Sequence, residues 1–380
     1  MSTTTGEFFA DLQEGGQLQA AGIGPNGVDI IVSDAKGDDL VQAELVRAAS
    51  SNPDTVGILT VDGSNTTMCG TIQSAIEAGL PVVSFDFIGD LCVPDNHILA
   101  SQFDTEIASL VLEEALNDLG TNLNVGYVSD LNYNPLIRRN TVWEKYKSQN
   151  NWNQVFFVNN AANYSSAEAL QDAIEGAIEG AIKGIPEKIE IDFIYSPWDY
   201  LAQNTMLALN ATTLKTENIS VYGADINTAD IQAMTKAGSE WKATAGASPD
   251  AIGALLIRLV ALAAANQTSE ITKAETDTTS SGQVKIPSTL ITQTFLRDNA
   301  ILNMDALEGA KPELALEDMM TACWICSSFL NPWNGTDNDN TKETKKQTKK
   351  QTKKQTKKQT KKQTKKQTKK EKGTSIIRQQ

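Results

Sequence analysis

The sequence is poor in the residues on which metal binding and acid–base catalysis most often depend. One histidine, His97, occurs in 380 residues, so no two-histidine metal site can form and any Ser- or Cys-based triad would have to use it. Four cysteines are too few for a disulfide-built scaffold, although they allow two bridges. With no nucleophile–base pair, phosphate loop or metal cluster in view, we predict neither an enzyme nor a cofactor.

Long apolar runs are also missing. The best candidate for a membrane span covers fifteen residues, 251–265, and includes Arg258, whereas a transmembrane helix needs about twenty apolar residues. The opening MSTTTGEFF has neither the basic nor the apolar part of a secretion signal. The chain as given therefore predicts no membrane span and no signal peptide.

The charge is distributed unevenly. The formal net charge is −14, but residues 341–380 contain 17 Lys and Arg against two Glu, which gives +15 there and −29 in the rest of the chain. Such an acidic body is a poor partner for nucleic acid, because phosphate recognition requires a basic face. The tail carries six Gln-Thr-Lys-Lys repeats over 347–370 with nothing apolar to bury, so we predict disorder. We favour a tail without a specific partner over electrostatic adhesion to membranes, nucleic acid or the acidic body, and we expect its deletion to leave ligand affinity unchanged.

The body alternates short apolar runs with amphipathic stretches of helical period. The predicted strands are 28–33, 56–61, 81–85, 123–129, 155–159, 189–195, 219–222, 241–245 and 284–291. The predicted helices are 37–51, 65–78, 105–119, 135–149, 165–184, 198–210, 228–237 and 249–265. Continuously apolar strands that alternate with helices are typical of parallel sheets covered on both faces, and about nine strands fit two sheets better than one.

One predicted helix carries an internal repeat. Residues 173–184 read Ala-Ile-x-Gly three times. The glycines would allow a close helix–helix contact, or the segment is an ordinary helix with one apolar stripe. We favour the ordinary helix, and the charged residues Glu175, Glu179 and Lys183 exclude a membrane dimer motif.

Polar residues follow several of the predicted strands, and their order along the chain is informative. VVSFD ends at Asp86 and VYGAD ends at Asp225; between them a helix opens with Ile137-Arg138-Arg139. KATAGASPDAIG and a further helix follow Asp225, and Phe8-Phe9 closes the opening segment. In this order the segments resemble the type I periplasmic solute-binding proteins of ABC transporters, in particular the ribose- and simple-sugar-binding branch. The resemblance covers about residues 2–296, and it implies that the opening segment up to Phe8-Phe9 is the loop after the family's first strand.

The resemblance implies two doubly wound α/β lobes joined by a hinge that the chain crosses three times. Lobe one would comprise 1–102 plus 248–282, and lobe two 103–247 plus 283–296. A C-terminal extension, 297–340, and the tail, 341–380, would lie outside the family fold. Ligands of open α/β sheets bind beyond the carboxyl ends of the strands, which is where Asp86 and Asp225 fall.

By the same resemblance, the ligand is a small polar molecule, most simply a monosaccharide, held in the cleft as the two lobes close. Aromatic side chains would pack on the sugar faces, and charged planar groups would bond its hydroxyls. The residues implied are Phe8, Phe9, Asp86, Arg139, Tyr164, Trp198 and Asp225. The implied partner is a membrane permease or receptor, and the implied location is periplasmic or extracellular. The alternative is a ligand-sensing receptor or regulator of the same fold with a non-sugar ligand. A regulator of the lac-repressor type would need an N-terminal helix-turn-helix, which this sequence does not show.

Each of these residues also has a structural interpretation. Asp86 and Asp225 could simply cap the following helices, although their order favours the site. Arg139 could be a surface residue beside Arg138, and Tyr164 could pack at a helix start. One of Phe8 and Phe9 should face inward, and Trp143 is expected in the core.

The chain departs from the family pattern at three positions. Gly6, Phe87 and Ala247 stand where the family has Asn, Arg and Gln. Three hydrogen-bonding side chains are thus replaced, so we expect a more apolar site and a less hydroxylated or differently shaped ligand.

Two further expectations concern the first lobe. The family fold begins with a central strand that has no counterpart here, so we predict that Met1 is not the biological start or that the sequence is a fragment. Cys69 and Cys92 fall in loops at one edge of the sheet, where a disulfide and two free thiols are equally compatible with the sequence. Cys323-Trp-Ile-Cys326 lacks a preceding thioredoxin-like strand, which favours a local disulfide or plain thiols.

Overall fold

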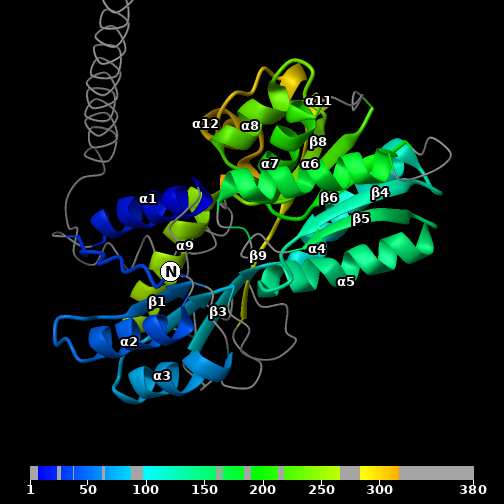
Figure 1. Ribbon diagram of the computed structural model, residues 1–380. Helices are drawn as coiled ribbons and strands as arrows, with labels where there is room; N and C mark the ends of the chain where they lie inside the picture. Colours follow the sequence, from blue (N-terminus) through cyan, green and yellow to red (C-terminus); the bar gives the residue numbers. More distant parts are fainter. Residues whose placement is uncertain are drawn as a thin grey trace, which may run out of the picture. The chain divides into compact units, whose positions relative to one another are not determined.

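The computed structural model describes residues 7–23, 27–36, 38–61, 65–86, 97–159, 164, 166–183, 190–212, 218–265 and 283–315. Within them the chain forms ten strands in two sheets, and a helix lies between most pairs of successive strands (Figure 1). The strands are β1 (Ile58–Val61), β2 (Val82–Phe85), β3 (His97–Gln102), β4 (Asn124–Ser129), β5 (Asn153–Asn159), β6 (Phe193–Ser196), β7 (Ser220–Gly223), β8 (Trp241–Gly246), β9 (Gln283–Ile286) and β10 (Thr289–Thr292). The helices are α1 (Glu7–Ala21), α2 (Asp39–Ser50), α3 (Asn65–Glu77), α4 (Asp104–Leu119), α5 (Asn134–Gln149), α6 (Ala167–Lys183), α7 (Asp199–Ala211), α8 (Thr228–Thr235), α9 (Pro249–Ala264), α11 (Gln293–Asp298) and α12 (Met304–Ala310), with a 3₁₀ turn at Pro312–Ala315.

The smaller sheet has four parallel strands in the order β1-β2-β3-β9. Its strands alternate their apolar side chains between two faces. Val83 and Phe85 pack on one face with residues of α1 and α9. Val82 and Leu99 pack on the other face with residues of α2 and α3. A sheet buried on both faces accounts for the continuously apolar strands of the sequence.

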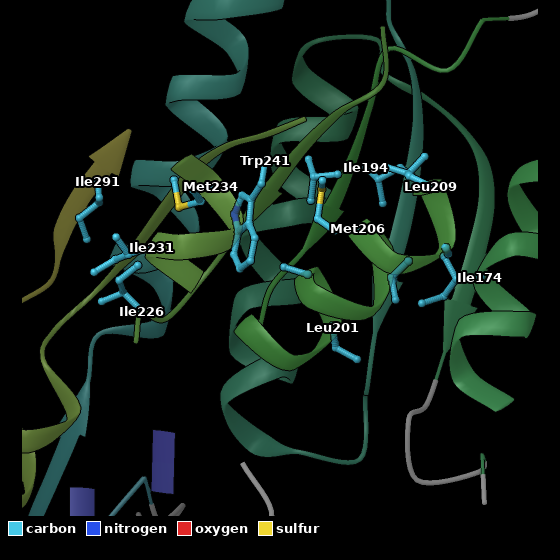
Figure 2. Packing of buried hydrophobic residues seen from close by; sticks show 14 of the residues in the cluster. Ile174, Ile194, Leu201, Met206, Leu209, Ile226, Ile231, Met234, Trp241 and Ile291 are labelled. Atoms are coloured by element: carbon cyan, nitrogen blue, oxygen red, sulfur yellow. The ribbon is translucent and has the colours of Figure 1, made fainter. Parts of the chain in front are cut away.

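The larger sheet has six strands in the order β10-β8-β7-β6-β4-β5. All of its pairings are parallel except that of β10 with β8, which is antiparallel. One face is covered by α4 and α5, where Trp143 is fully buried as expected. On the opposite face Trp241, Met206, Ile194 and Ile291 belong to one apolar cluster, part of which Figure 2 shows. The predicted two-sheet α/β architecture is therefore confirmed.

The chain passes between the two sheets at three places in the described residues. It leaves β3 of the four-stranded sheet for α4, leaves β8 of the six-stranded sheet for α9, and runs from β9 directly into β10. The prediction of a single strand over 284–291 was wrong, because this run divides into β9 and β10. Residues 283–286 pair with β3 in the four-stranded sheet, whereas the sequence analysis placed them in the second lobe.

Three other local predictions were wrong. Residues 28–33, predicted as a strand, belong to neither sheet, and Ile31 is 82% exposed. The structure describes no strand on the outer side of β1 with which such a segment could pair. Phe8 and Phe9, placed in a loop, lie in the first turn of α1.

The third error concerns β3, which the sequence analysis missed because its buried face is partly polar. His97 on β3 forms a hydrogen bond of 2.7 Å with the Ser84 hydroxyl on β2, which forms another of 2.7 Å with Thr60 on β1. Burial lowers the pKa of His97 to about 4, so the imidazole is neutral at physiological pH. A hydrogen-bonded chain across three strands thus compensates for the polar atoms inside the sheet.

The C-terminal part of the described chain packs against the six-stranded sheet. Leu296, Met304, Leu307 and Leu314 are buried in the same cluster as Trp241. The first part of the predicted C-terminal extension, as far as residue 315, is therefore built into this half of the fold. Cys323, Cys326 and the repeats of the tail lie outside the described residues. None of the described helices is both long and apolar enough to span a membrane.

Candidate functional site

Asp86 and Asp225 occupy equivalent positions in the two sheets. Asp86 directly follows β2, and Asp225 follows β7 by two residues. Both have a left-handed backbone, with φ of 55° and 66°. The Asp86 amide donates to the Ala100 carbonyl on the neighbouring strand (2.9 Å), and the Asp225 amide donates to the Ala245 carbonyl in the same way (2.8 Å). Left-handed geometry at a non-glycine residue is uncommon, and its occurrence at two corresponding strand ends indicates a functional constraint.

Arg139 on α5 is the centre of the polar network. Its side chain is only 2% exposed, and its guanidinium meets both oxygens of Asp225 at 3.0 and 3.1 Å. Nε donates to Asp104 at 2.9 Å, and Nη1 also donates to the Pro197 carbonyl at 2.6 Å. Burial alone would lower the pKa of Arg139, but Asp225 and Asp104 outweigh it and raise the pKa above its ordinary value. A planar guanidinium held on three sides is fixed in orientation.

Asp104, the first residue of α4, is a site residue that the sequence analysis missed. It is fully buried and receives Arg139 through one oxygen and Arg138 through the other, the latter at 2.5–2.6 Å. Asp104 lies two residues beyond Gln102, the last residue of β3, and Gln102 makes a long 3.4 Å contact with Asp225. The polar network therefore joins the first crossing between the sheets to the strand ends of the larger one.

The Asp86 side chain lines the same pocket as this network but forms no hydrogen bond with it. Its Oδ1 atom is buried and has no hydrogen-bond partner. Burial, followed by repulsion from Asp104, raises the pKa of Asp86 well above its ordinary value, although Arg138 and Arg139 oppose the shift. A buried acceptor without a partner is unfavourable, so this atom is a point at which a ligand hydroxyl would be stabilising.

A second set of carboxyl groups lies behind Asp225. Asp199, at the start of α7, accepts hydrogen bonds from the Tyr200 amide (2.6 Å) and the Asn227 side chain (2.8 Å). Asn227 caps α8 together with Asp230, through a reciprocal capping box. Burial and the proximity of Asp225 raise the pKa of Asp199 to about 7. These bonds fix the segment that runs from Asp225 into α8.

A cavity opens where the strand ends of the two sheets face each other. The space between its walls measures about 580 Å³, including the part open to solvent. Its lining comes from both halves of the fold. The residues are Phe8, Phe9, Val61, Asp86, Gln102, Tyr133, Pro135, Leu136, Arg139, Trp198 and Asp225. Four of these eleven side chains carry hydrogen-bonding or charged groups at the polar corner, and the other seven are apolar or aromatic.

This arrangement, two sheets of mostly parallel strands with a pocket at their strand ends, matches a known protein family. The model of the periplasmic binding protein domain family matches residues 1–268, more than two-thirds of the chain. The chain belongs to this family. Its predicted fold class, the type I periplasmic binding protein fold, is confirmed. No curated protein matches the sequence.

Solved structures of similar fold are solute-binding components of transporters. A 5-methylthioribose transporter solute-binding protein from Thermotoga lettingae TMO, in complex with 5-methylthioribose, is 26% identical, with a TM-score of 0.70 over 82% of this chain and 91% of that one. A sugar ABC transporter protein from Yersinia enterocolitica has 20% identity and a TM-score of 0.73 over 87% and 92%. The arabinose-binding component from Shewanella sp. ANA-3 has 16% identity and a TM-score of 0.65 over 83% and 96%.

Six of the seven predicted site residues line the pocket of this periplasmic binding protein. They are Phe8, Phe9, Asp86, Arg139, Trp198 and Asp225. Tyr164 is not among the lining residues; it packs against the apolar cluster around Trp241. A single aromatic residue before a helix is equally suited to either role, so sequence alone could not decide between them.

The sequence analysis also missed lining residues, of which Gln102 and Tyr133 are the clearest examples. Gln102 ends the strand that was not predicted, and Tyr133 lies in the turn before α5, where aromatic residues have many roles. Tyr133 packs at 6.0 Å from Trp198 between ring centres, so these two residues form one aromatic wall. The signal for Gln102 was its position as the last residue of the first segment of the predicted lobe one.

Cys69 does not have a free thiol, since it is disulfide-bonded in the structure. Cys92 lies outside the described residues, so the pairing of Cys69 with Cys92 stays a prediction. Among the described residues, no group of three or more His, Cys, Asp or Glu side chains is arranged to hold a metal ion.

Proposed function

We propose that this periplasmic binding protein binds a neutral sugar or polyol in the pocket between its two sheets and delivers it to an ABC-type membrane permease. The observation that carries the proposal is the meeting of Asp86, Arg139 and Asp225 beside aromatic side chains in one cavity. Paired charged and planar groups bond adjacent hydroxyls, and aromatic rings cover the C–H faces of a sugar. The ligands named for the solved relatives, 5-methylthioribose and arabinose, belong to this chemical class.

The action we propose is closure of the two halves around the ligand. Phe8, Phe9 and Asp86 belong to the half with the four-stranded sheet, whereas Arg139 and Asp225 belong to the other half. A ligand that contacts both sets is held more tightly when the halves are close, and this differential affinity shifts the population toward the closed state. The three chain crossings between the sheets provide the hinge.

We also propose that the protein acts by binding alone, outside the cytoplasm. The one histidine, His97, lies within the four-stranded sheet and does not line the pocket, so a general base of that kind is not positioned for a bound ligand. The family and the solved relatives support a periplasmic or extracellular location and a permease partner.

Calorimetric titration with pentoses, hexoses and linear polyols tests this function. We expect at least one neutral sugar to bind with a dissociation constant in the micromolar range or below, and small-angle scattering to show a smaller radius of gyration with that sugar than without it. Absence of binding across the panel by protein with a cooperative thermal transition would refute the proposal.

A further inference from the structure

Among the described lining residues, the polar part of the pocket offers few free hydrogen-bonding positions. Arg139 has five N–H groups, and four of them donate to Asp104, Asp225 and the Pro197 carbonyl. Only one N–H of Nη2 is left for a ligand. Both oxygens of Asp225 already accept from Arg139, and one of them is also approached by Gln102.

The positions that remain are mostly acceptors. Asp86 Oδ1 and Gln102 Oε1 are buried, lie in the pocket lining and have no hydrogen-bond partner. Together with the remaining lone pair on Asp225 Oδ2, they would accept about three hydroxyl protons, by ordinary carboxylate and amide capacity. This part of the pocket therefore recognises a short row of hydroxyl groups.

The charges around the pocket do not favour an anion. Asp86, Asp104 and Asp225 face Arg138 and Arg139, which gives a net charge of −1 with all carboxylates ionised and zero with Asp86 protonated. In neither state is Arg138 or Arg139 left without an acidic partner. Phosphorylated sugars and sugar acids would be repelled or left unpaired.

The rest of the described lining offers nothing to a hydroxyl through its side chains beyond the phenol of Tyr133 and the indole N–H of Trp198. Phe8, Phe9 and Val61 come from one half of the fold, and Pro135, Leu136 and Trp198 from the other. A fully hydroxylated sugar has a hydroxyl on nearly every carbon, and one turned toward Phe9, Pro135 or Leu136 would lose its water without a replacement bond. An apolar group there would instead gain from burial.

We propose that the ligand is a neutral sugar in which one hydroxyl is replaced by a compact apolar group, that is, a deoxy, alkyl or alkylthio sugar. Its hydroxylated edge bonds Asp86, Gln102, Arg139 and Asp225, and its apolar group lies between the Phe9 side and the Trp198 side of the pocket. This inference rests on the proposed sugar-binding function and names the class of sugar.

Calorimetric titration with matched pairs tests the inference on the full chain. The pairs are D-ribose with 5-methylthio-D-ribose, D-galactose with D-fucose, and L-mannose with L-rhamnose, with D-ribose 5-phosphate as the anion. We expect the tightest ligand to be the apolar member of its pair and to bind at least tenfold more tightly than its hydroxylated partner, because even one extra methylene in an apolar pocket contributes a factor of roughly 10–200. We expect no binding of the phosphate.

The outcomes separate the inference from the function beneath it. A tightest ligand that is fully hydroxylated, or phosphate binding comparable to that of ribose, overturns the inference and leaves sugar binding standing. No binding by any member of the panel overturns both.

Two pocket variants locate the apolar group. In Phe9→Ala and Trp198→Ala, we expect the ratio of the two dissociation constants within the best pair to fall at least threefold in one or both. Leu18→Ala, a 56% exposed position on the same helix as Phe9, should leave the ratio unchanged. A variant that merely weakens the fold lowers both affinities together, so a ratio unchanged in both pocket variants contradicts the placement.

Discussion

Arg139 and its carboxylate partners set the polar corner of the pocket before any ligand arrives. Asp104 and Asp225 hold the guanidinium from two sides, and the Pro197 carbonyl takes a third bond. A buried charge network of this kind contributes little net stability compared with apolar packing, but it is strongly destabilising to break. The network is therefore best understood as preorganisation of the binding site.

Replacing Arg139 by lysine tests how far the network depends on the planar guanidinium. Lysine keeps the charge but cannot reach Asp104, Asp225 and the Pro197 carbonyl together, so buried acceptors lose their donors. We expect Arg139→Lys to lower the free energy of unfolding by about 2–4 kcal/mol in urea titrations. Arg138→Lys is the matched control, because Arg138 is 31% exposed and bonds Asp104 alone; we expect a loss below about 1 kcal/mol. Equal effects at both positions would contradict the central role of Arg139.

Asp199 makes the stability of the fold decrease as the pH rises toward neutrality. Its pKa is raised to about 7 in the folded protein, so between roughly pH 4 and 7 the folded state binds more protons than the unfolded state. Stability from this group therefore falls as the pH rises through that window and is level above it. We expect Asp199→Asn to make the decline in Tm between pH 4.5 and 7.5 shallower, whereas Asp54→Asn, at an exposed position, leaves it unchanged. An identical decline in Asp199→Asn would show that this carboxyl does not titrate there.

At the residue scale, the sequence was sufficient where a polar residue follows an apolar strand. Asp86 and Asp225 could be found in that way, because the ends of parallel strands converge on one edge. Asp104 could not, since an acidic residue at the start of a helix is ordinary and is explained by the helix dipole alone. Its role appears only when α4 and α5 pack together and bring it to Arg138 and Arg139.

At the scale of elements, the contact between α1 and α9 depends on glycine. A methyl group at Gly253 would overlap the backbone carbonyl of Leu12, and one at Gly15 would overlap that of Asp250. The two helices therefore approach backbone to backbone, and this contact supports the turn of α1 that carries Phe8 and Phe9 into the pocket. The Ala-Ile-x-Gly repeat, by contrast, makes no such contact, since nothing lies within 4 Å of a methyl at Gly176 or Gly180.

A pair of glycine-to-alanine variants distinguishes the two helices. We expect Gly253→Ala to lower the free energy of unfolding by about 1–3 kcal/mol or more, because the backbone of α1 must move away. Gly180 lies in the middle of α6 at an exposed position, with free space for a methyl group. We therefore expect Gly180→Ala to raise the free energy of unfolding by about 0.5–1 kcal/mol. Chemical denaturation measures both. Tolerance of alanine at position 253 would contradict the close approach of α1 and α9.

The outer edge of β1 is the other distinctive element. In the described part of the chain β1 pairs only with β2, and the apolar segment 28–33 joins no sheet. Strand propensity was correctly read from VDIIVS, but a strand forms only where a neighbour completes its hydrogen bonds. The opposite error occurred at β3, where polar residues concealed a strand that pairs with β2 on one side and β9 on the other.

Adding a strand should therefore stabilise this half of the fold. We expect fusion of a six-residue Val/Ile-rich segment and a short linker ahead of residue 1 to raise Tm by several degrees, because the added strand can pair along β1 and continue through α1 as a right-handed crossover. The same fusion with prolines at alternate strand positions is the control, since proline cannot donate to the ladder. Equal Tm values for the two fusions would mean that the edge does not accept a strand.

At the scale of the whole molecule, the two-sheet architecture could be predicted from the alternation of strands and helices, because both faces of each sheet are covered and the strands are correspondingly apolar. The three crossings came from the family resemblance rather than from the residues. The split of 284–291 between two sheets could not be predicted, since a continuous apolar run does not show where it changes sheet. The charge imbalance between body and tail separates the segment that carries the site from the repeats beyond it.

The central claim is that a neutral sugar binds where the two halves meet, with Asp86 as a ligand contact from the half that carries the smaller sheet. The most direct test is a pair of calorimetric titrations of intact protein and Asp86→Gly with the tightest sugar of the panel. Glycine tolerates the left-handed backbone of position 86, so the carboxyl group is removed without backbone strain. Lys36→Gly is the control, because Lys36 also has a left-handed backbone but is exposed. We predict at least a tenfold loss of affinity in Asp86→Gly and none in Lys36→Gly; unchanged affinity in Asp86→Gly would contradict the account.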